Sequence, residues 1–303
     1  MRSSAVAEEA ISRGIESIFV GNLANIDWVE KRIRGLGFKE VFSSSDVRDL
    51  DGQDCLFLDT YDRKVSQLAY ESNKWKKIIL MLDRHTPVSQ ADLTIHPGLD
   101  ASWAEGIQGK FLYGPSFIPF RRSIHKQDFT DFTDFPNILV FGGGTDPHDF
   151  ALEMASHLRN FDCIRQVIFI SNKSSEIEKL DSRFRVEAFG ETLDLQLEST
   201  DLVFTTASTS SLEILARGIP FGIACAVDNQ IDYYQKLRES GYAIGIGDRT
   251  KSGSWVLDRR SIELLVCDTE SRKSLVEKSS GIVDMLGSSR IVDEIIKLST
   301  SQP

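Results

Sequence analysis

The sequence has no apolar run long enough to cross a bilayer. A membrane-spanning helix needs roughly 20 consecutive apolar residues, and no stretch of the chain approaches this length. The first 14 residues also lack the apolar core of a secretory signal. We therefore expect a cytoplasmic protein without stable membrane insertion.

Positive charge is also scarce. The 35 lysines and arginines are outnumbered by 45 aspartates and glutamates, which gives a formal net charge of -10. Non-specific binding to nucleic acid needs a dense cationic surface. The short basic clusters at residues 74–77, 121–122 and 259–260 are typical of solvated helix ends and loops. The composition therefore predicts no nucleic-acid partner.

Cysteine and histidine are few and do not have the spacing of metal ligands. The cysteines are scattered in apolar runs, and no pair has the C-x-x-C spacing of zinc or redox sites. The five histidines show no H-x-x-x-H spacing. We expect no metal and no cofactor, and we expect every cysteine to be a buried thiol that serves as a small hydrophobic side chain. These cysteines are Cys55, Cys163, Cys225 and Cys267.

The chain does have the length and the pattern of a two-domain α/β protein. Its 303 residues exceed one ordinary core, and 41% hydrophobic with 26% charged residues is usual for a globular chain. Short apolar runs alternate with segments of helical period, which is typical of parallel sheets built from βαβ units. In the first half we predict strands over residues 17–21, 40–42, 55–59, 77–82 and 93–95, and helices over 2–13 and 25–36.

The pattern restarts after a polar segment. Residues 123–137, SIHKQDFTDFTDFPN, have no clear period and predict a linker between domains 1–122 and 138–303. Beyond it we predict strands within 138–144 and over 166–171, 201–206, 221–227 and 243–247. The predicted helices cover 149–160, 210–218, 231–241, 261–267, 270–283 and 289–298. The predicted fold is therefore two Rossmann-like, doubly wound α/β domains that face a central cleft, a favoured place for a ligand.

The predicted N-terminal domain lacks its opening unit. A doubly wound domain normally starts with a strand and a turn, whereas this sequence starts within the first helix. Either the domain has lost its first βα unit, or the sequence begins downstream of the original start.

A glycine-rich segment, FGGGTDP, follows the strand that ends near residue 141. Glycines allow positive φ and close approach of a ligand to backbone amides, and a helix start attracts phosphate. The segment is therefore suited to binding a phosphate. The alternative is a tight turn in which Asp146 or Thr145 caps the next helix.

Two further polar segments follow predicted strands. TTASTSSLE, residues 205–213, crowds six hydroxyls at a strand-to-helix junction, more than one helix cap needs, although a capping box remains the alternative. Surplus hydroxyls suit phosphate and sugar oxygens, and a carboxylate such as Glu213 can accept both hydroxyls of a ribose. VDNQ, residues 227–230, offers paired donors and acceptors for sugar hydroxyls, or a helix cap.

The three segments in this order resemble the C-terminal domain of the nucleotide-sugar hydrolases of pseudaminic acid biosynthesis and of the spore-coat polysaccharide biosynthesis proteins. More distantly, they are similar to the N-acetylglucosaminyltransferase of peptidoglycan lipid synthesis. The stretch SGYAIGIG, residues 240–247, and DMLGSSRIV, residues 284–292, also match the family pattern. Thinner matches at 1–4, 58–61, 82–83 and 114–121 extend the resemblance over nearly the whole chain.

The resemblance implies the glycosyltransferase-B architecture, with the nucleotide held by the C-terminal domain. It further implies that Asp59 and Tyr61 border the reacting carbon as catalytic residues from the N-terminal domain. For the substrate, it implies Gly143, Gly144 and Thr145 near the nucleotide, Ser208, Thr209 and Ser210 at the diphosphate, Glu213 at the ribose, and Asn229 with Gln230 at the sugar.

One family element is absent from the sequence. The G-x-G-H loop, whose histidine is the implied general base, has no counterpart here. The first hypothesis is a metal-independent, inverting hydrolase that releases the free sugar from a UDP-sugar in surface-polysaccharide or nonulosonic acid biosynthesis. The alternatives are a glycosyltransferase with a UDP-sugar donor and a non-catalytic nucleotide-sugar-binding protein.

Overall fold

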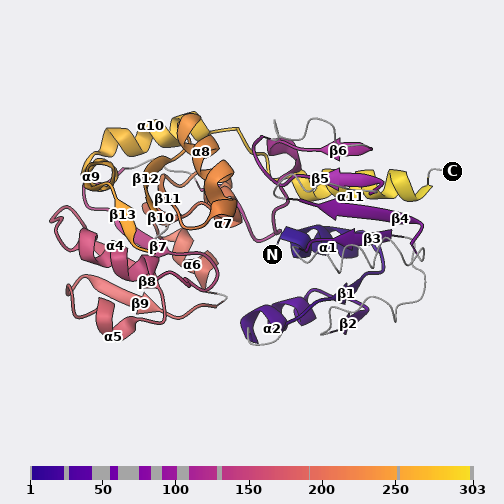
Figure 1. Cartoon of the computed structure of the whole chain (residues 1–303), viewed down its shortest axis with the longest axis horizontal. Coiled ribbons are helices and arrows are strands. Elements are labelled where there is room, and N and C mark those ends of the chain that lie inside the picture. Colours follow the sequence, from indigo (N-terminus) through magenta and orange to yellow (C-terminus); the bar gives the residue numbers. More distant parts are fainter. Residues whose placement is uncertain are drawn as a thin grey trace. The chain divides into compact units, whose positions relative to one another are not determined.

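The computed structural model describes residues 2–23, 27–42, 55–60, 75–82, 91–100, 109–127, 132–190, 192–250 and 253–300. The chain forms two compact units (Figure 1). Unit 1 comprises residues 1–122 and 284–303, and unit 2 comprises residues 123–283. None of the described helices is both long and apolar enough to span a membrane.

Unit 1 contains two parallel sheets in its described part. The strands β1 (Ile18–Val20) and β2 (Glu40–Phe42) form one pair. The second sheet has the order β3-β4-β5-β6, from β3 (Cys55–Leu58), β4 (Lys77–Met81), β5 (Leu93–Ile95) and β6 (Lys110–Leu112). The described helices of this unit are α1 (Arg2–Ser12), α2 (Asp27–Gly35), the 3-10 turn η2 (Pro115–Phe117) and α11 (Gly287–Thr300). The short strand β6 was not predicted.

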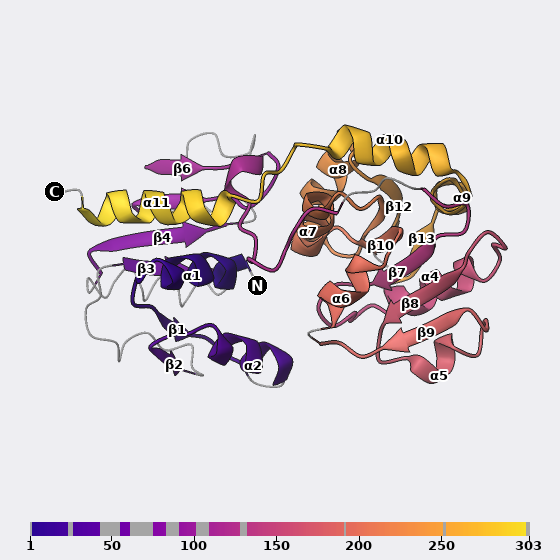
Figure 2. The ribbon, with the colours of Figure 1, turned by 180° about the vertical axis from the view of Figure 1, so that it is seen from behind.

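The last helix of the chain corrects the predicted domain boundary. Residues 284–303 were expected in the C-terminal domain, but α11 belongs to unit 1. Figure 2 shows this helix alongside α1 and β4. Its buried Ile291 and Val292 share one apolar cluster with Val6 of α1 and Ile79 of β4. An apolar helix face is stabilised by burial against any complementary apolar surface. Periodicity therefore predicts the helix but not the domain against which it packs.

Unit 2 is built on a seven-stranded sheet of order β13-β12-β11-β10-β7-β8-β9, parallel except for β13. Its strands are β7 (Asn137–Phe141), β8 (Gln166–Ile170), β9 (Phe184–Glu187), β10 (Leu202–Thr206), β11 (Phe221–Cys225), β12 (Ile244–Arg249) and β13 (Trp255–Leu257). The α-helices are α4 (Phe150–Leu158), α5 (Ser174–Ile177), α6 (Leu193–Glu198), α7 (Thr209–Arg217), α8 (Ile231–Glu239), α9 (Arg259–Cys267) and α10 (Thr269–Ser279). The 3-10 turn η3 (Asp228–Gln230) precedes α8.

The predicted βαβ alternation of unit 2 is present, and the short elements are the ones that the sequence pattern missed. β9, β13, α5 and α6 contain between three and six residues each. Segments of this length give only a weak periodic signal, which is easily missed between longer elements.

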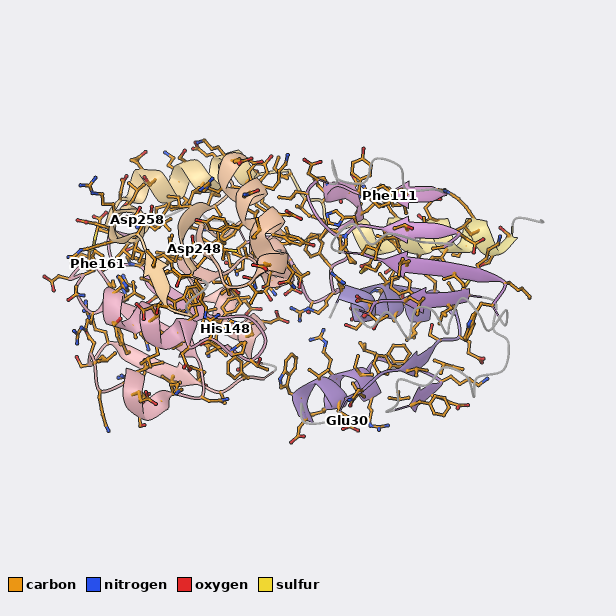
Figure 3. The ribbon with its side chains drawn as sticks, in the orientation of Figure 1. Glu30, Phe111, His148, Phe161, Asp248 and Asp258 are labelled. Atoms are coloured by element: carbon orange, nitrogen blue, oxygen red, sulfur yellow. A yellow bond between two sulfur atoms is a disulfide. The ribbon has the colours of Figure 1, made fainter. Side chains whose placement is uncertain are left out.

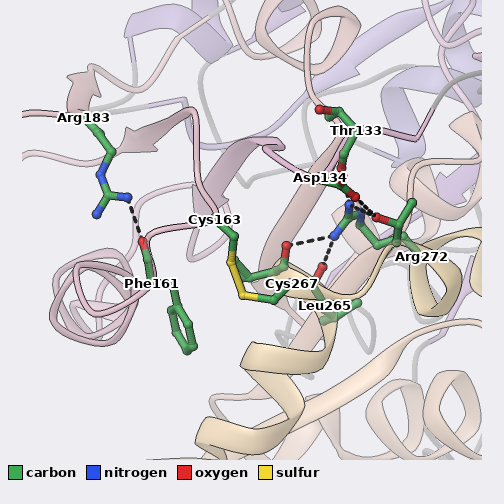
Figure 4. Close-up of a disulfide and its surroundings, with 10 residues drawn as sticks. Thr133, Asp134, Phe161, Cys163, Arg183, Leu265, Cys267 and Arg272 are labelled. Carbon is green, nitrogen blue, oxygen red and sulfur yellow. Dashed lines mark hydrogen bonds between the residues drawn. A yellow bond between two sulfur atoms is a disulfide. The ribbon is translucent and has the colours of Figure 1, made fainter.

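Two of the four cysteines form a disulfide, which corrects the prediction of four free thiols. Cys163 follows α4, Cys267 ends α9, and their Cα atoms are 5.9 Å apart despite a sequence separation of 104 (Figure 4). The buried Arg272 donates to the carbonyl oxygens of Leu265 and Val266 at the end of α9. The prediction was wrong because only the folded sheet brings the ends of α4 and α9 together.

Candidate functional site

The three predicted ligand-binding segments start side by side at one edge of the unit 2 sheet. β10 lies between β7 and β11, and all three strands run parallel. Phe141, the last residue of β7, is in register with Thr205, and Thr206 is in register with Ala224 of β11. The loops that follow these strands therefore begin next to one another, at the carboxyl edge where α/β sheets bind ligands.

In the loop after β7, Asp146 caps α4. Its carboxylate oxygens accept hydrogen bonds of 2.9 Å from the backbone amides of Phe150 and Ala151. Burial raises the pKa of the Asp146 carboxyl group, and the two hydrogen bonds from backbone amides offset part of this rise. The helix start that the sequence suggested for a phosphate is thus occupied by a side chain, and the capping alternative holds for Asp146.

Gly142 makes this cap possible. A Cβ atom at this position would lie 1.9 Å from an oxygen of the Asp146 carboxylate. The absence of a side chain at Gly142 is therefore required for the local structure, independently of any ligand.

The next residues of this loop face the neighbouring strand. Gly143 has a φ of +96°, and a Cβ atom built on it would lie 3.8 Å from the hydroxyl oxygen of Thr206. Gly144 and Thr145 are exposed. The backbone of the glycine loop thus comes close to the hydroxyls that follow β10.

The segment after β10 contains buried hydroxyls with unused hydrogen-bonding capacity. The hydroxyl oxygens of Thr205, Thr206 and Ser208 are buried and have no hydrogen-bond partner in the described structure. Side chains alternate along a strand, so Thr205 and Thr206 point to opposite faces, and Thr206 is the one beside Gly143. Leaving such groups unpaired costs about 1 to 3 kcal/mol each, which makes them candidates for contact with a bound molecule.

The N-terminus of α7 has no side-chain cap. Ser208 occupies the capping position with extended backbone, but its hydroxyl does not bond to the helix. By contrast, Asp258 and Asp268 cap α9 and α10 through their side chains. Thr209 and Ser210 form the half-buried first turn of α7, and Glu213 lies half-buried one turn further on. The positive end of the α7 dipole therefore coincides with the buried hydroxyls.

In the loop after β11, the two candidate side chains are arranged differently. The side-chain oxygen of Gln230 accepts a 2.9 Å hydrogen bond from the backbone amide of Ala226, so it stabilises its own loop. Asn229 is exposed at the same sheet edge. Of the two residues, Asn229 is the one whose side chain is not committed to the backbone of this loop.

In unit 1, Asp59 follows β3 and forms an ion pair with Arg2. The Nη2 atom of Arg2 lies 2.6 Å from Oδ1, and Nε lies 3.1 Å from both carboxylate oxygens. Both side chains are largely buried, with exposures of 10% and 16%. Tyr61, the second predicted catalytic residue, lies outside the described residues, as does the whole of segment 61–74.

Two features of these sites were missed at the sequence level. The Arg2–Asp59 pair joins residues 57 positions apart, so no local pattern indicates it. The second is a bond from the indole nitrogen of Trp255 to the carbonyl oxygen of His148, which ties β13 to the loop after β7. No described group of three or more histidine, cysteine, aspartate or glutamate side chains has the arrangement of a metal site.

No protein-family model and no curated protein sequence matches the chain. Solved structures match over nearly its full length. The glycotransferase of kitacinnamycin has a TM-score of 0.69 and 13% identity, and covers 98% of this chain and 94% of its own. An Arabidopsis thaliana protein complexed with UDP-L-rhamnose has a TM-score of 0.67 and 11% identity, and covers 98% and 95%. A UDP-N-acetylglucosamine 2-epimerase has a TM-score of 0.64 and 13% identity, and covers 100% and 96%.

These likenesses confirm the predicted fold class. The chain has an α/β fold with parallel sheets, of the type shared by glycosyltransferase-B enzymes and UDP-N-acetylglucosamine 2-epimerase. Sequence identities of 11% to 13% are evidence for the fold only, and they do not single out the hydrolase family.

Proposed function

We propose that the protein is a glycosyltransferase that takes its sugar from a UDP-sugar bound at the carboxyl edge of the unit 2 sheet. One observation carries the proposal: the buried, unpartnered hydroxyls of Thr206 and Ser208 lie at the uncapped start of α7, and Gly143 faces Thr206. Solved relatives in fold include glycosyltransferases, and one of them was solved with a UDP-sugar.

The hydroxyls of this edge suit a diphosphate. Each hydroxyl can donate to a phosphate oxygen, which removes the penalty of an unpaired buried group. The helix dipole of α7 favours the same negative charge, whereas α4 is already capped by Asp146. We therefore assign the diphosphate to the start of α7, with Thr209 and Ser210, and the nucleotide side to Gly143, Gly144 and Thr145.

The remaining candidates contact the two sugars in this proposal. The Glu213 carboxylate accepts the ribose hydroxyls, and the Asn229 amide both donates to and accepts from the transferred sugar. Gln230 acts indirectly, because its side-chain oxygen holds the loop that presents Asn229.

The chemistry is a metal-independent, inverting displacement at the anomeric carbon. The bond to the diphosphate oxygen breaks while an acceptor oxygen attacks from the opposite side and loses its proton. In this proposal, the hydroxyls and amides of unit 2 stabilise the leaving diphosphate as its charge develops. Within unit 1, Asp59 forms an ion pair with Arg2, and Asp59 and Tyr61 remain predicted catalytic residues.

Hydrolysis is the second candidate. It is favoured by the sequence pattern over residues 142–245, which resembles nucleotide-sugar hydrolases more specifically than transferases. In that case water replaces the acceptor oxygen in the same displacement.

Titration calorimetry with UDP tests the binding site. Thr206→Val and Ser208→Ala should each weaken UDP binding about 10-fold, because each removes one donor to a charged oxygen. Ser156→Ala is the matched control, since the Ser156 hydroxyl bonds only within α4 and its loss should leave the affinity unchanged. Absence of UDP binding to the unaltered protein would refute the proposal.

Phosphorus NMR with UDP-sugars separates the reactions. UDP release that requires an added acceptor supports transfer, and release without an acceptor supports hydrolysis. Binding without release under both conditions would support a non-catalytic nucleotide-sugar-binding protein.

A further inference from the structure

The loops of the proposed diphosphate site contain no positive side chain. Segments 142–146, 205–210 and 226–230 include two aspartates and neither lysine nor arginine. A helix terminus contributes only about half of a positive charge, and a diphosphate brings more negative charge than that. A cation from a neighbouring element would balance the site.

On one side of the site, the lysine that follows β8 already forms ion pairs. Lys173 follows β8, the neighbour of β7, but its ammonium nitrogen lies 3.8 Å from Asp149 and 3.6 Å from Glu176. On the other side, Arg249 ends β12, the neighbour of β11. Within the part of the chain that the structure describes, its guanidinium makes no hydrogen bond and no ion pair, although the residue is half-buried.

The strand register places Arg249 level with the start of the loop that follows β11. Cys225, the last residue of β11, is in register with Asp248, so Arg249 extends one residue beyond the end of β11. β12 is the second strand from β10, a lateral distance of roughly 10 Å. An arginine side chain and a diphosphate can together span this distance.

The hairpin that carries Arg249 is tied to the glycine loop. Trp255 is paired with Arg249 across the hairpin, and its indole nitrogen donates a 2.8 Å hydrogen bond to the carbonyl oxygen of His148. Its ring also packs against Phe150, with ring centroids 5.1 Å apart. His148 and Asp248 are labelled in Figure 3. The Arg249 guanidinium lies over the hairpin turn, since a Cβ atom on Gly253 would be 3.0 Å from its Nη2 atom.

We infer that Arg249 binds the diphosphate of the nucleotide and sets the preference of the site for nucleoside diphosphates over uncharged nucleosides. The inference rests on the proposed function. A guanidinium can form two parallel hydrogen bonds to phosphate oxygens and always carries its charge. Arg249 thus supplies the positive charge that the three loops lack.

Titration calorimetry with UDP and with uridine tests this role. Arg249→Gln should weaken UDP binding about 10- to 100-fold and leave uridine binding unchanged, because only the charged group is lost. Arg249→Lys should recover part of the UDP affinity. Arg165→Gln is the matched control, because Arg165 is exposed at the opposite edge of the sheet, directly before β8. If circular dichroism shows that Arg249→Gln does not fold, Arg249→Met replaces it.

The outcomes separate the two proposals. If the unaltered protein binds UDP and the Arg249 variants bind it equally well, the role of Arg249 is refuted and the proposed function stands. Equal losses of UDP and uridine affinity would also refute it, because they indicate a general structural effect. If the unaltered protein binds no UDP, the proposed function itself fails.

Discussion

Removal of the Cys163–Cys267 disulfide should destabilise unit 2 strongly. The bond closes a loop with a sequence separation of 104, and cross-linking a loop of this length reduces the entropy of the unfolded chain by an amount equivalent to about 4.7 kcal/mol at 25 °C. In the folded state, Arg272 still bonds to Leu265 and Val266 at the end of α9 without the disulfide. We therefore expect the Cys163→Ala/Cys267→Ala variant to fold and to lose about 4 kcal/mol of unfolding free energy.

Urea unfolding, monitored by hydrogen exchange with mass spectrometry, measures the loss of unfolding free energy for each unit separately. Peptides of unit 2 should lose protection at a lower urea concentration in the variant, and peptides of unit 1 should not change. A variant with Cys55 and Cys225 replaced by serine is the control, because these two cysteines take no part in the disulfide. Alkylation of the unfolded, unreduced protein should modify two of the four cysteines.

Two results would contradict the reasoning. One is an unchanged urea midpoint for unit 2 after loss of the disulfide. The other is modification of all four cysteines in protein purified without reductant.

Two further predictions concern charged groups. Burial raises the folded-state pKa of Asp146 above its ordinary value, so the fold favours the protonated acid. The wild type should therefore lose stability relative to Asp146→Asn as the pH rises from the ordinary pKa of an aspartate to the raised folded-state pKa. Thermal melting of both proteins from acidic to neutral pH measures the difference, and a pH-independent difference would contradict the prediction. In unit 1, Arg2→Ala and Asp59→Asn should each lower the unfolding free energy by about 1 to 3 kcal/mol, since each removes one charge of a largely buried ion pair. Neither substitution should change the UDP affinity, and unchanged denaturation midpoints would show that the pair does not stabilise the unit.

The repeated elements of the fold could be predicted from sequence because their signal is local. The apolar runs at β7, β10 and β11 and the helical period of α8 are properties of consecutive residues. The glycine and hydroxyl segments could be located for the same reason, since they follow these runs directly. The short strands β6 and β13 were not predicted.

The roles within the candidate site depended on contacts that no local pattern contains. The sequence left open whether Asp146 or a ligand occupies the start of α4. Two hydrogen bonds from backbone amides to the Asp146 carboxylate show that Asp146 occupies it. The same holds for Gln230, whose oxygen is bonded to the backbone of its own loop. Sequence alone did single out the segment of Ser208, but not that its hydroxyl is buried without a partner.

The α/β class, the order of the main strands and helices, and the three polar segments follow from local sequence, because hydrophobic period and turn chemistry act between residues close along the chain. Which distant segments meet is known only from the folded chain. Examples are the disulfide across 104 positions, the packing of α11 in unit 1, and the place of Arg249 beside β11. These depend on strand order and on the burial of apolar faces, which are properties of the whole fold.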